Sequence, residues 1–348
     1  MRIVQVGPGE TLPGGMLSVE HFLRDSRLGK RFGLSIVATA SKHHKLLSFI
    51  LGFSQIKKLI RIGECDCVHI HMSENASVYR ASIIIRWIKN HSRSRVIVHS
   101  HGGSVQYFFD RCSQKTRRFL LKSLELIDSL VVLTPGWEKW WRTLLPSLKI
   151  SVIPNGVNVP FLDVAKKENA NVVLFLGQIC EAKGVYCLLD AVQGVIERFP
   201  EVNFVFAGDG EIQKCLAYAE TLGIKENCVF VGWVGKHEKE ILLKRASVLV
   251  LPSKVESFGI VLLEAMAYAV PVICSDGGFM HEVVDDRQNG IVFSFGDSVQ
   301  LACAICEIFE FPGCAVEMGI SGRKKVEEVY SADKVLAQWE RLYEGLLR

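Results

Sequence analysis

The sequence predicts an α/β protein in which two doubly wound, Rossmann-like domains follow one another along the chain. Short apolar runs of strand length alternate with amphipathic segments of helix length, a pattern typical of parallel sheets. The 348 residues, 49% of them hydrophobic, suffice for two separate cores. The polar stretch Asn158–Glu168 interrupts the alternation and predicts the boundary between the domains.

The N-terminal domain is expected to span residues 1–160, with helices between its strands. Gly14-Gly15 lies in the loop between the first strand and a predicted helix, Met16–Leu28. His99 and His101 lie where the fourth strand ends, and ligands of open α/β sheets bind at that end of the strands. The predicted strands are Ile3–Val6, Leu34–Thr39, Cys67–His71, Val96–His99, Ser129–Leu133 and Ser151–Ile153.

The second domain is expected at residues 161–330 and repeats the alternation. Its predicted strands are Val172–Leu176, Asn203–Ala207, Val229–Val231, Ser247–Leu251 and Pro271–Cys274. A helix is predicted at Phe258–Tyr268. A last helix is expected within residues 331–348, because Ala332–Leu347 carries an apolar stripe at helical spacing: Val335, Leu336, Trp339, Leu342 and Leu346.

Charge is distributed unevenly between the two halves. Residues 1–160 contain 23 Lys and Arg against 10 Asp and Glu, whereas residues 161–348 contain 18 against 27. The basic half predicts an anionic partner such as a bilayer surface, a lipid phosphate or a nucleic acid. The chain begins with a strand rather than a signal peptide, and no apolar run is long enough to cross a bilayer. We therefore expect any membrane contact to be peripheral.

The cysteines indicate a reducing compartment. There are eleven, an odd number without the spacing of a disulfide framework or a zinc site. Cys67, Cys228 and Cys274 lie in apolar, strand-like runs, where cysteine acts as a small hydrophobe. The expected location is cytoplasmic, with peripheral association at the inner face of the cell membrane.

Two glutamates, Glu256 and Glu264, flank the start of the predicted helix Phe258–Tyr268. A strand that leads into a helix through a tight loop presents free N–H groups and the positive end of the helix dipole, which together bind phosphate. Gly259 allows a ligand to approach the backbone. Glu264 is placed to accept hydrogen bonds from ribose, and Glu256 from a second polyhydroxylated group. This pattern suits a nucleotide-sugar; the alternative is an ordinary βα unit with a surface and a capping glutamate.

The pattern Glu256-x7-Glu264 resembles the retaining nucleotide-sugar glycosyltransferases of GT-B fold, family GT4. Further parts of the family pattern occur in order: Gly14-Gly15, His99–Gly102, Ile153–Val157, Phe175–Gly177 with Lys183-Gly184, Gly208–Glu211, and Pro271–Gly278 with Glu282. The resemblance covers nearly the whole chain. It implies two domains around a cleft, the last helix crossing back onto the first domain, an acceptor site in the first domain and a nucleotide-sugar site in the second. It also implies that no metal is required, and the Asp-x-Asp signature of GT-A enzymes is absent.

The resemblance also implies roles for individual residues. Lys183 matches a phosphate-binding lysine, and His101 matches the active-site histidine that contacts the donor sugar; with Glu256 they form the expected catalytic set. Gln178 departs from the pattern, because the family usually has an arginine there and glutamine carries no charge. The expected donor-nucleotide site comprises Gly15, Gly177, Gln178, Lys183, Gly208, Glu211, Val234, Phe258, Gly259, Ile260, Val261 and Glu264.

Other histidines and aromatic residues have less specific interpretations. His69 and His71 are expected to be hydrogen-bonded structural residues, and a zinc site formed by them with His99 and His101 lacks support from spacing. The segment Ser41–Ile62 mixes basic and large apolar residues, which suits either an interfacial helix or a core-covering helix with a basic outer face. A second basic group, suited to a lipid diphosphate, is Arg111, Lys115, Arg117, Arg118 and Lys122; an interfacial or sugar-stacking surface is expected from Trp137, Trp140 and Trp141.

The sequence thus predicts a hexosyltransferase-type enzyme. It would move a sugar, with retention, from a nucleotide-diphosphate-sugar (UDP-sugar before GDP-sugar) to a hydroxyl of a lipid-linked saccharide or glycan precursor in the synthesis of cell-surface polysaccharide, such as lipopolysaccharide or capsule. One alternative is a non-transferring GT-B enzyme such as a sugar-nucleotide epimerase, which would carry a different carboxylate and histidine set. Another is a nucleotide-binding or nucleic-acid-binding module, although the chain lacks an aromatic or helix-turn-helix recognition pattern. No Gly-x-Gly-x-x-Gly follows the first strand, which argues against a dinucleotide oxidoreductase.

Overall fold

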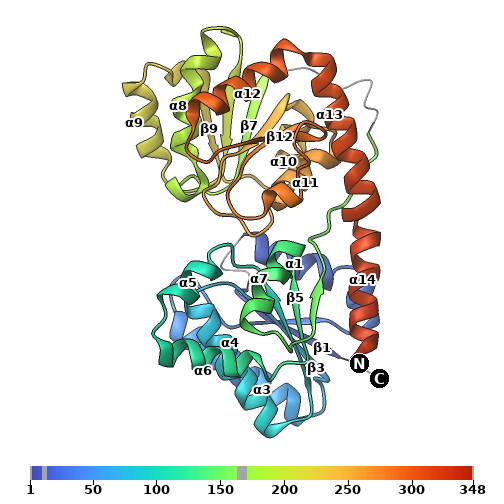
Figure 1. Ribbon diagram of the computed structural model, residues 1–348. Coiled ribbons are helices and arrows are strands. Elements are labelled where there is room, and N and C mark those ends of the chain that lie inside the picture. Colours follow the sequence, from blue (N-terminus) through green and yellow to red (C-terminus); the bar gives the residue numbers. More distant parts are fainter. Residues whose placement is uncertain (1, 10–13, 163–170, 347–348) are drawn as a thin grey trace. The chain divides into compact units, whose positions relative to one another are not determined.

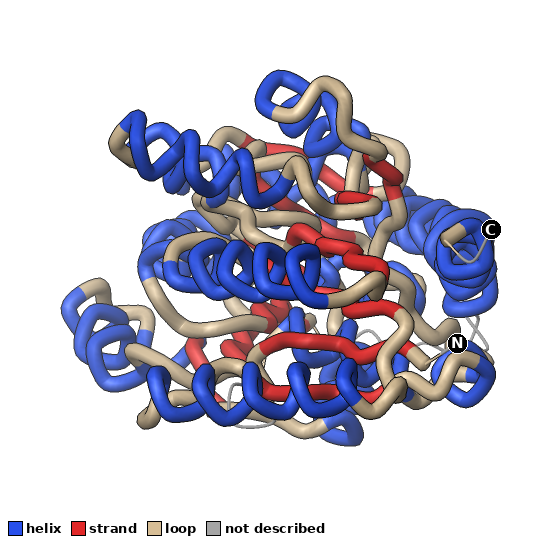
Figure 2. Tube along the Cα trace, turned by 90° about the horizontal axis from the view of Figure 1, so that it is seen from below, coloured by secondary structure: helices blue, strands red, loops and turns tan. Residues whose placement is uncertain are grey.

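The computed structural model describes residues 2–9, 14–162 and 171–346, and the chain forms two compact units. Unit 1 comprises Met1–Gly156 together with Asp333–Arg348, and unit 2 comprises Val157–Ala332. Each unit contains one parallel six-stranded sheet with helices on both faces (Figures 1 and 2). The division lies four residues before the expected end of the first domain at residue 160, and part of the expected boundary, residues 163–170, lies outside the described residues.

The sheet of unit 1 has the order β2-β1-β3-β4-β5-β6. The strand order changes direction between β1 and β3. At such a reversal point the connections after the two strands run to opposite faces of the sheet, which leaves a space at the carboxyl ends of these strands. The six strands match the predicted set to within one or two residues at each end. They are β1 (Ile3–Gly7), β2 (Ser35–Ala38), β3 (Cys67–Met72), β4 (Arg95–Ser100), β5 (Ser129–Val132) and β6 (Ile150–Val152).

The helices of unit 1 differ from expectation at one place. The predicted helix Met16–Leu28 is two helices, because the side-chain oxygen of Ser26 accepts hydrogen bonds from the N–H groups of Leu28 and Gly29 and so caps a new helix. The helices are α1 (Gly15–Arg24), α2 (Arg27–Arg31), α3 (Lys45–Arg61), α4 (Ala76–His91), α5 (Val105–Arg111), α6 (Gln114–Leu124) and α7 (Pro135–Leu144).

The last helix, α14 (Ala332–Gly345), packs against unit 1 (Figure 1). All five residues of the predicted apolar stripe are buried, and so is Tyr343, which the stripe did not include. Tyr343 packs edge to face on Phe32. On the outer side Arg31 forms ion pairs with Glu340 and Glu344. Unit 1 is therefore completed by residues from the end of the chain.

The sheet of unit 2 has the order β12-β11-β10-β7-β8-β9 and reverses between β7 and β10. Its sixth strand, β12, was not predicted, because the short run Gly290–Phe293 directly follows the polar turn Asp285–Asn289. The other strands are β7 (Val172–Leu176), β8 (Asn203–Ala207), β9 (Cys228–Gly232), β10 (Val248–Leu251) and β11 (Val272–Ser275). The helices are α8 (Val185–Ile196), α9 (Ile212–Thr221), α10 (Lys236–Arg245), α11 (Ile260–Ala267), α12 (Ser298–Glu310) and α13 (Pro312–Lys325).

Two chemical expectations can be compared with this fold. Cys67, Cys228 and Cys274 are buried free thiols, as their apolar context predicted. Among the described residues, no single helix has both the length and the hydropathy needed to cross a bilayer. The one pair that passes together, Ser298–Glu310 with Pro312–Tyr330, is bent by 101° at its break.

Candidate active site

Two loops meet at the point where the sheet of unit 2 reverses. One follows β7 and the other follows β10, and they pack backbone to backbone. Gly184 has a left-handed backbone (φ 72°), and a Cβ there would lie 1.8 Å from the carbonyl oxygen of Pro252. The N–H of Lys254 donates to the carbonyl of Ala182 at 3.0 Å. A glycine is therefore required at 184 for the two loops to approach this closely.

The two loops also carry two of the three predicted catalytic residues, and the structure brings these two together. The ammonium group of Lys183 forms an ion pair with a carboxylate oxygen of Glu256. Their side chains are 29% and 15% exposed, so the pair lies at the rim of the loops rather than in the core. The sequence predicts separate ligands for the two residues, phosphate for Lys183 and sugar for Glu256, and carries no signal for the ion pair between them.

Helix α11 begins at Ile260, two residues later than predicted. Gly259 adopts a left-handed conformation (φ 77°) that precedes the first helical turn. The N–H groups of Ile260 and Val261 donate to no other described residue, as expected for the open end of a helix. Phe258 is buried against Tyr330, so only its backbone faces this end of α11.

Glu264, the predicted ribose acceptor, forms an ion pair with Lys239 of α10. Both side chains are partly exposed. No sequence pattern indicates this contact, because Lys239 lies in the charge-rich segment Lys236–Lys244, which is typical of any solvated helix.

The remaining predicted nucleotide residues lie around the same edge of the sheet. A Cβ on Gly208 would lie 1.8 Å from the carbonyl oxygen of Gly177, so the loops after β7 and β8 are also in backbone contact. Glu211 pairs with Lys214, while Gln178 is exposed. Val234 lines a hollow of about 490 Å³ beside an exposed tryptophan, Trp233.

In unit 1, Gly15 begins α1 and Gly14 is its N-cap. No atom of the described residues would lie within 4 Å of a Cβ at either glycine. Residues 10–13 of the preceding loop lie outside the described residues.

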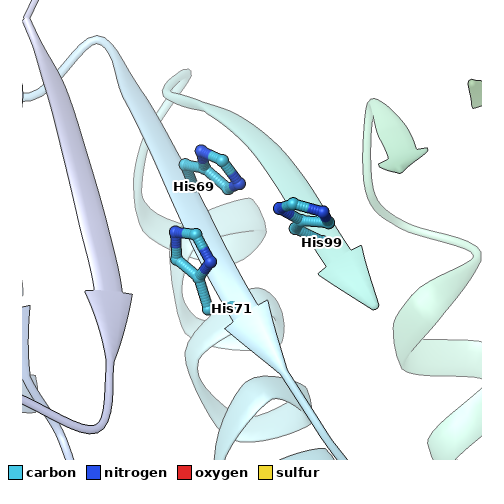
Figure 3. A group of neighbouring side chains, drawn as sticks. All are labelled: His69, His71 and His99. Carbon is cyan, nitrogen blue, oxygen red and sulfur yellow. The ribbon is translucent and has the colours of Figure 1, made fainter. Parts of the chain in front are cut away.

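Four histidines of unit 1 form a cluster on one face of the sheet. His69 and His71 lie on β3, and His99 lies on β4 directly opposite His71 in the register (Figure 3). His101 follows β4, and its ring lies 3.9 Å from that of His99 between centroids. Burial disfavours the charged imidazolium, so it lowers the pKa of His69 and His101 from 6.5 to about 3 and lowers the pKa of His71 and His99 well below 6.5. All four rings are neutral at physiological pH.

Hydrogen bonds connect three of these rings to defined partners. Nδ1 of His69 lies 2.8 Å from the hydroxyl of Tyr343. Nε2 of His71 lies 2.9 Å from Oε1 of Gln5, and Nδ1 of His71 lies 2.9 Å from Nε2 of His101. Among the described residues, neither nitrogen of His99 has a hydrogen-bond partner. The hydrogen bonds expected for His69 and His71 are present, and both residues contact groups that the sequence did not identify.

The cluster is compact enough to be considered as a metal centre. One nitrogen from each of His69, His71 and His99 lies within 4.8 Å of the others. Zinc–nitrogen bonds of about 2.0–2.1 Å place tetrahedral ligands about 3.3 Å apart, and a zinc ligand directs a ring edge at the metal. Here the rings of His69 and His71 are stacked at 4.4 Å, and both nitrogens of His71 already have partners. As arranged, the cluster is a hydrogen-bonded stack rather than a coordination sphere.

The basic and apolar residues expected on the surface of unit 1 are exposed in part. On α3 the exposed apolar residues are Leu46, Leu47, Ile50 and Leu51. Lys57 is partly buried and lies over the ring of Phe53, so it belongs less to the outer face than expected. The second basic group lies on α5 and α6, where only Arg117 is partly buried.

The expectation of a tryptophan surface was wrong for two residues. Trp137 and Trp141 are buried, with 4% and 0% exposure, and only Trp140 is partly exposed. Their spacing of four residues places both on the inner face of α7, where they pack against β5, β6 and Phe109.

Comparison with known proteins identifies the family. The model for glycosyl transferases group 1 matches residues 162–325, and the model for glycosyltransferase family 4 matches residues 22–160. The chain is 30% identical over 309 residues, covering 88% of this chain and 83% of the relative, to an uncharacterized glycosyltransferase of Methanocaldococcus jannaschii. This chain belongs to the group 1, family 4 glycosyltransferases. It is therefore an enzyme of the hexosyltransferase type.

Other relatives of this glycosyltransferase agree with that assignment. It is 27% identical to the phosphatidyl-myo-inositol mannosyltransferase of Mycolicibacterium smegmatis, over 99% of this chain and 94% of the relative. Among solved structures, a sucrose-phosphate synthase from Thermosynechococcus elongatus matches with a TM-score of 0.81 at 18% identity, covering 100% and 99% of the two chains. Anabaena HepE in complex with UDP-glucose matches with a TM-score of 0.78 at 17% identity, covering 99% and 100%. These structures confirm the GT-B fold.

Proposed function

We propose that this glycosyltransferase moves a hexose, with retention of anomeric configuration, from a nucleotide-diphosphate-sugar to a hydroxyl of a lipid-linked saccharide or glycan precursor. The observation that carries the proposal is the ion pair of Lys183 with Glu256, held by two packed loops at the reversal point of the unit 2 sheet. Ligands of doubly wound sheets bind at such reversal points. Unit 2 is accordingly the nucleotide-sugar domain, and unit 1 is the acceptor domain.

The diphosphate would bind at the start of α11. The free N–H groups of Ile260 and Val261 supply donors, and the helix dipole adds positive potential. Gly259 has no side chain to block the approach of the phosphate. Glu264 then lies one turn further along α11, where it accepts from the ribose hydroxyls.

Lys183 and Glu256 would exchange partners when the donor binds. As the bond between the sugar carbon and the diphosphate oxygen breaks, negative charge develops on the departing phosphate. Lys183 then neutralises this charge instead of that of Glu256. Released from the lysine, Glu256 accepts hydrogen bonds from the sugar. The new bond forms between the sugar carbon and the acceptor oxygen, and the proton of the acceptor hydroxyl passes to the departing phosphate oxygen.

The donor and acceptor classes are inferred from relatives. HepE has been crystallised with UDP and with UDP-glucose, which favours a UDP-sugar, with a GDP-sugar second. The mannosyltransferases among the relatives are named for a phosphatidylinositol acceptor, which favours a lipid-linked acceptor here. We propose that catalysis needs no metal ion, since Lys183 and the start of α11 supply the positive charge, and that the product enters a cell-surface polysaccharide such as lipopolysaccharide or capsule.

Membrane association is proposed from α3. Leu46, Leu47, Ile50 and Leu51 are between 54% and 72% exposed, next to the exposed cations Lys45 and Lys58. A helix that presents leucine and lysine together suits the headgroup region of an anionic bilayer. We propose that the enzyme acts in the cytoplasm, at the inner face of the cell membrane.

A donor panel tests the proposed activity. The purified protein is incubated with UDP-, GDP- and ADP-hexoses, and release of nucleoside diphosphate is measured with and without a chelator. We expect release from one nucleotide class, UDP before GDP, and no effect of the chelator. Proton NMR of the first product reports the anomeric configuration. An inverted product would overturn retention, and epimerised donor without release would favour the epimerase alternative.

A further inference from the structure

The histidine cluster contains a hydrogen-bonded chain that starts at the reversal point of the unit 1 sheet. Gln5 lies on β1 and His71 on β3, the two strands between which the sheet order reverses. His101 follows β4. The chain therefore runs from the buried reversal point to the one histidine of the cluster that is partly exposed. Each link restricts where the next ring can carry its proton.

The first link is fixed by the backbone. Nε2 of Gln5 lies 3.1 Å from the carbonyl oxygen of Glu20 in α1. A carbonyl oxygen can only accept, so the amide nitrogen of Gln5 must face Glu20 and its oxygen must face His71. Gln5 is fully buried, and therefore no water competes for either position.

The second link follows from the first. Because Oε1 of Gln5 can only accept, the nitrogen of His71 beside it, Nε2, must carry a proton. His71 is neutral, so its Nδ1 has no proton and can only accept. Nδ1 of His71 faces Nε2 of His101 at 2.9 Å, and that nitrogen must therefore donate.

We propose that Gln5 and His71 are positioning residues that hold His101 in the tautomer protonated at Nε2, so that its Nδ1 is available as a hydrogen-bond acceptor for a substrate hydroxyl. No hydrogen bond joins Nδ1 of His101 to any described residue. The proposal rests on the proposed function, in which the substrates of this enzyme carry sugar hydroxyls.

The tautomer selects the chemical group that His101 recognises. A neutral ring with a free lone pair accepts a hydrogen bond from a sugar hydroxyl, but it repels a carboxylate at the same place. The neighbouring rings do not compete with this arrangement. Among the described residues His99 makes no hydrogen bond, and His69 is bonded to Tyr343.

Nitrogen NMR of the full chain with labelled histidine tests the tautomer without any substrate. The signals of His101 are assigned by their loss in His101→Asn. At neutral pH we expect a protonated Nε2 and an unprotonated Nδ1 on His101. A ring protonated at Nδ1, or at both nitrogens, would overturn the proposal. So would Zn²⁺ that shifts the signals of His69, His71 and His99 together at one equivalent, since the cluster would then be a metal site.

Matched variants test the chain itself. His71→Leu and His69→Leu place the same side chain on the same buried strand, but only the first removes the acceptor beside His101. His71→Asn keeps an oxygen near the position of Nδ1 and should restore the wild-type signals of His101. Gln5→Met, of nearly the same volume, removes the first acceptor and provides a second variant if His71→Leu does not fold. A His101 tautomer that is unchanged in Gln5→Met and in His71→Leu refutes the role of the chain.

Measurements of kcat distinguish a positioning role of His71 from a purely structural one. With the hexose donor that is active in the panel, His71→Leu should lower kcat by about tenfold, as for loss of one oriented hydrogen bond, while nucleoside diphosphate affinity stays unchanged. His69→Leu should retain kcat. Equal losses in both leucine variants would indicate a structural role only. If no donor is active, the proposed function fails, while the NMR result still decides whether the chain fixes the tautomer.

Discussion

The two units hold their polar residues in opposite ways. In unit 1 the candidate residues are neutral histidines stacked on a buried sheet face, with an amide and a tyrosine as partners. In unit 2 the candidate residues are carboxylates and lysines that form partly exposed ion pairs, one between two loops and one between two helices. Burial of a neutral base fixes the position of a proton, whereas a surface ion pair can exchange one partner for a ligand at little cost. The first arrangement suits orientation of a sugar, and the second suits capture of a phosphate.

The largest expected difference between the two units is in how acid changes their stability. Unfolded histidine has a pKa of about 6.5, while His69 and His101 in the folded state have pKa values of about 3. Unfolding therefore takes up protons below pH 6.5, so stability is complete above that pH and is lost as pH falls toward 3. The loss is about 1.4 kcal/mol per pH unit for each histidine. Urea unfolding followed by tryptophan fluorescence, at a series of pH values, measures it.

The assay reports mainly unit 1, because five of the six tryptophans belong to it. In unit 2 the histidines, His237 and His281, are both exposed, so we expect little change in its stability. The double variant His43→Gln and His44→Gln, at exposed positions before α3, should leave the pH dependence unaltered. A urea midpoint for unit 1 that stays constant between pH 7 and pH 5 would contradict the neutral cluster.

Replacement of Lys183 by alanine should reduce turnover by roughly 10²–10³-fold, the usual cost of removing one preorganised group that stabilises developing charge. The control is Lys254→Ala, an exposed lysine on the same pair of loops. Steady-state kinetics with the active donor measures both variants. Equal turnover in the two would remove Lys183 from the mechanism. Gln178→Arg, added to Lys183→Ala, tests whether position 178 faces the phosphate. If it does, the arginine should restore part of the turnover lost in Lys183→Ala.

Glu264→Gln should weaken nucleotide binding by about 1.5–3 kcal/mol, because a ribose hydroxyl loses a charged acceptor. Calorimetry with the nucleoside diphosphate measures the change, and Glu317→Gln on the exposed face of α13 is the control. Glu256→Ala should instead reduce sugar transfer more than nucleotide affinity. Unchanged affinity in Glu264→Gln would show that the Lys239 pair is structural only.

The smallest expected effect per residue concerns α3. Neutralising Lys45, Lys58 and Arg61 should release the protein from anionic vesicles, at about 1 kcal/mol for each charge. Vesicle flotation in low salt measures binding, and raising the salt should weaken it. The control neutralises Lys244 and Arg245, two exposed cations of unit 2. If the protein never floats with vesicles but still glycosylates a soluble acceptor, the proposed membrane association is contradicted and the proposed transferase activity is retained.

Sequence patterns predicted the parts of the molecule that depend on local order. Eleven of the twelve strands followed from apolar runs, and Gly259 followed from its place between a strand and a helix. Contacts between distant segments carry no local signal. Lys239 and Glu264 are 25 residues apart on two helices, and Gln5 is 66 residues from His71, so neither contact was predicted. The tryptophans of α7 show the opposite error, since proximity in sequence suggested a surface where helical periodicity buries two of the three.

The contact between His69 and Tyr343 joins residues 274 positions apart, and Tyr343 lies on α14, which follows unit 2 in the chain. During synthesis, residues 157–332 emerge as one continuous segment, so unit 2 has its whole sequence available before the final helix leaves the ribosome. Residues 1–156 of unit 1 are made before unit 2, but unit 1 cannot complete its fold until α14 has been made. We expect the nascent first half to expose its unfinished sheet face throughout elongation, and a ribosome stalled near residue 330 should carry a folded second unit beside an incomplete first one. Removal of α14 should therefore damage unit 1, whose other residues are made before unit 2.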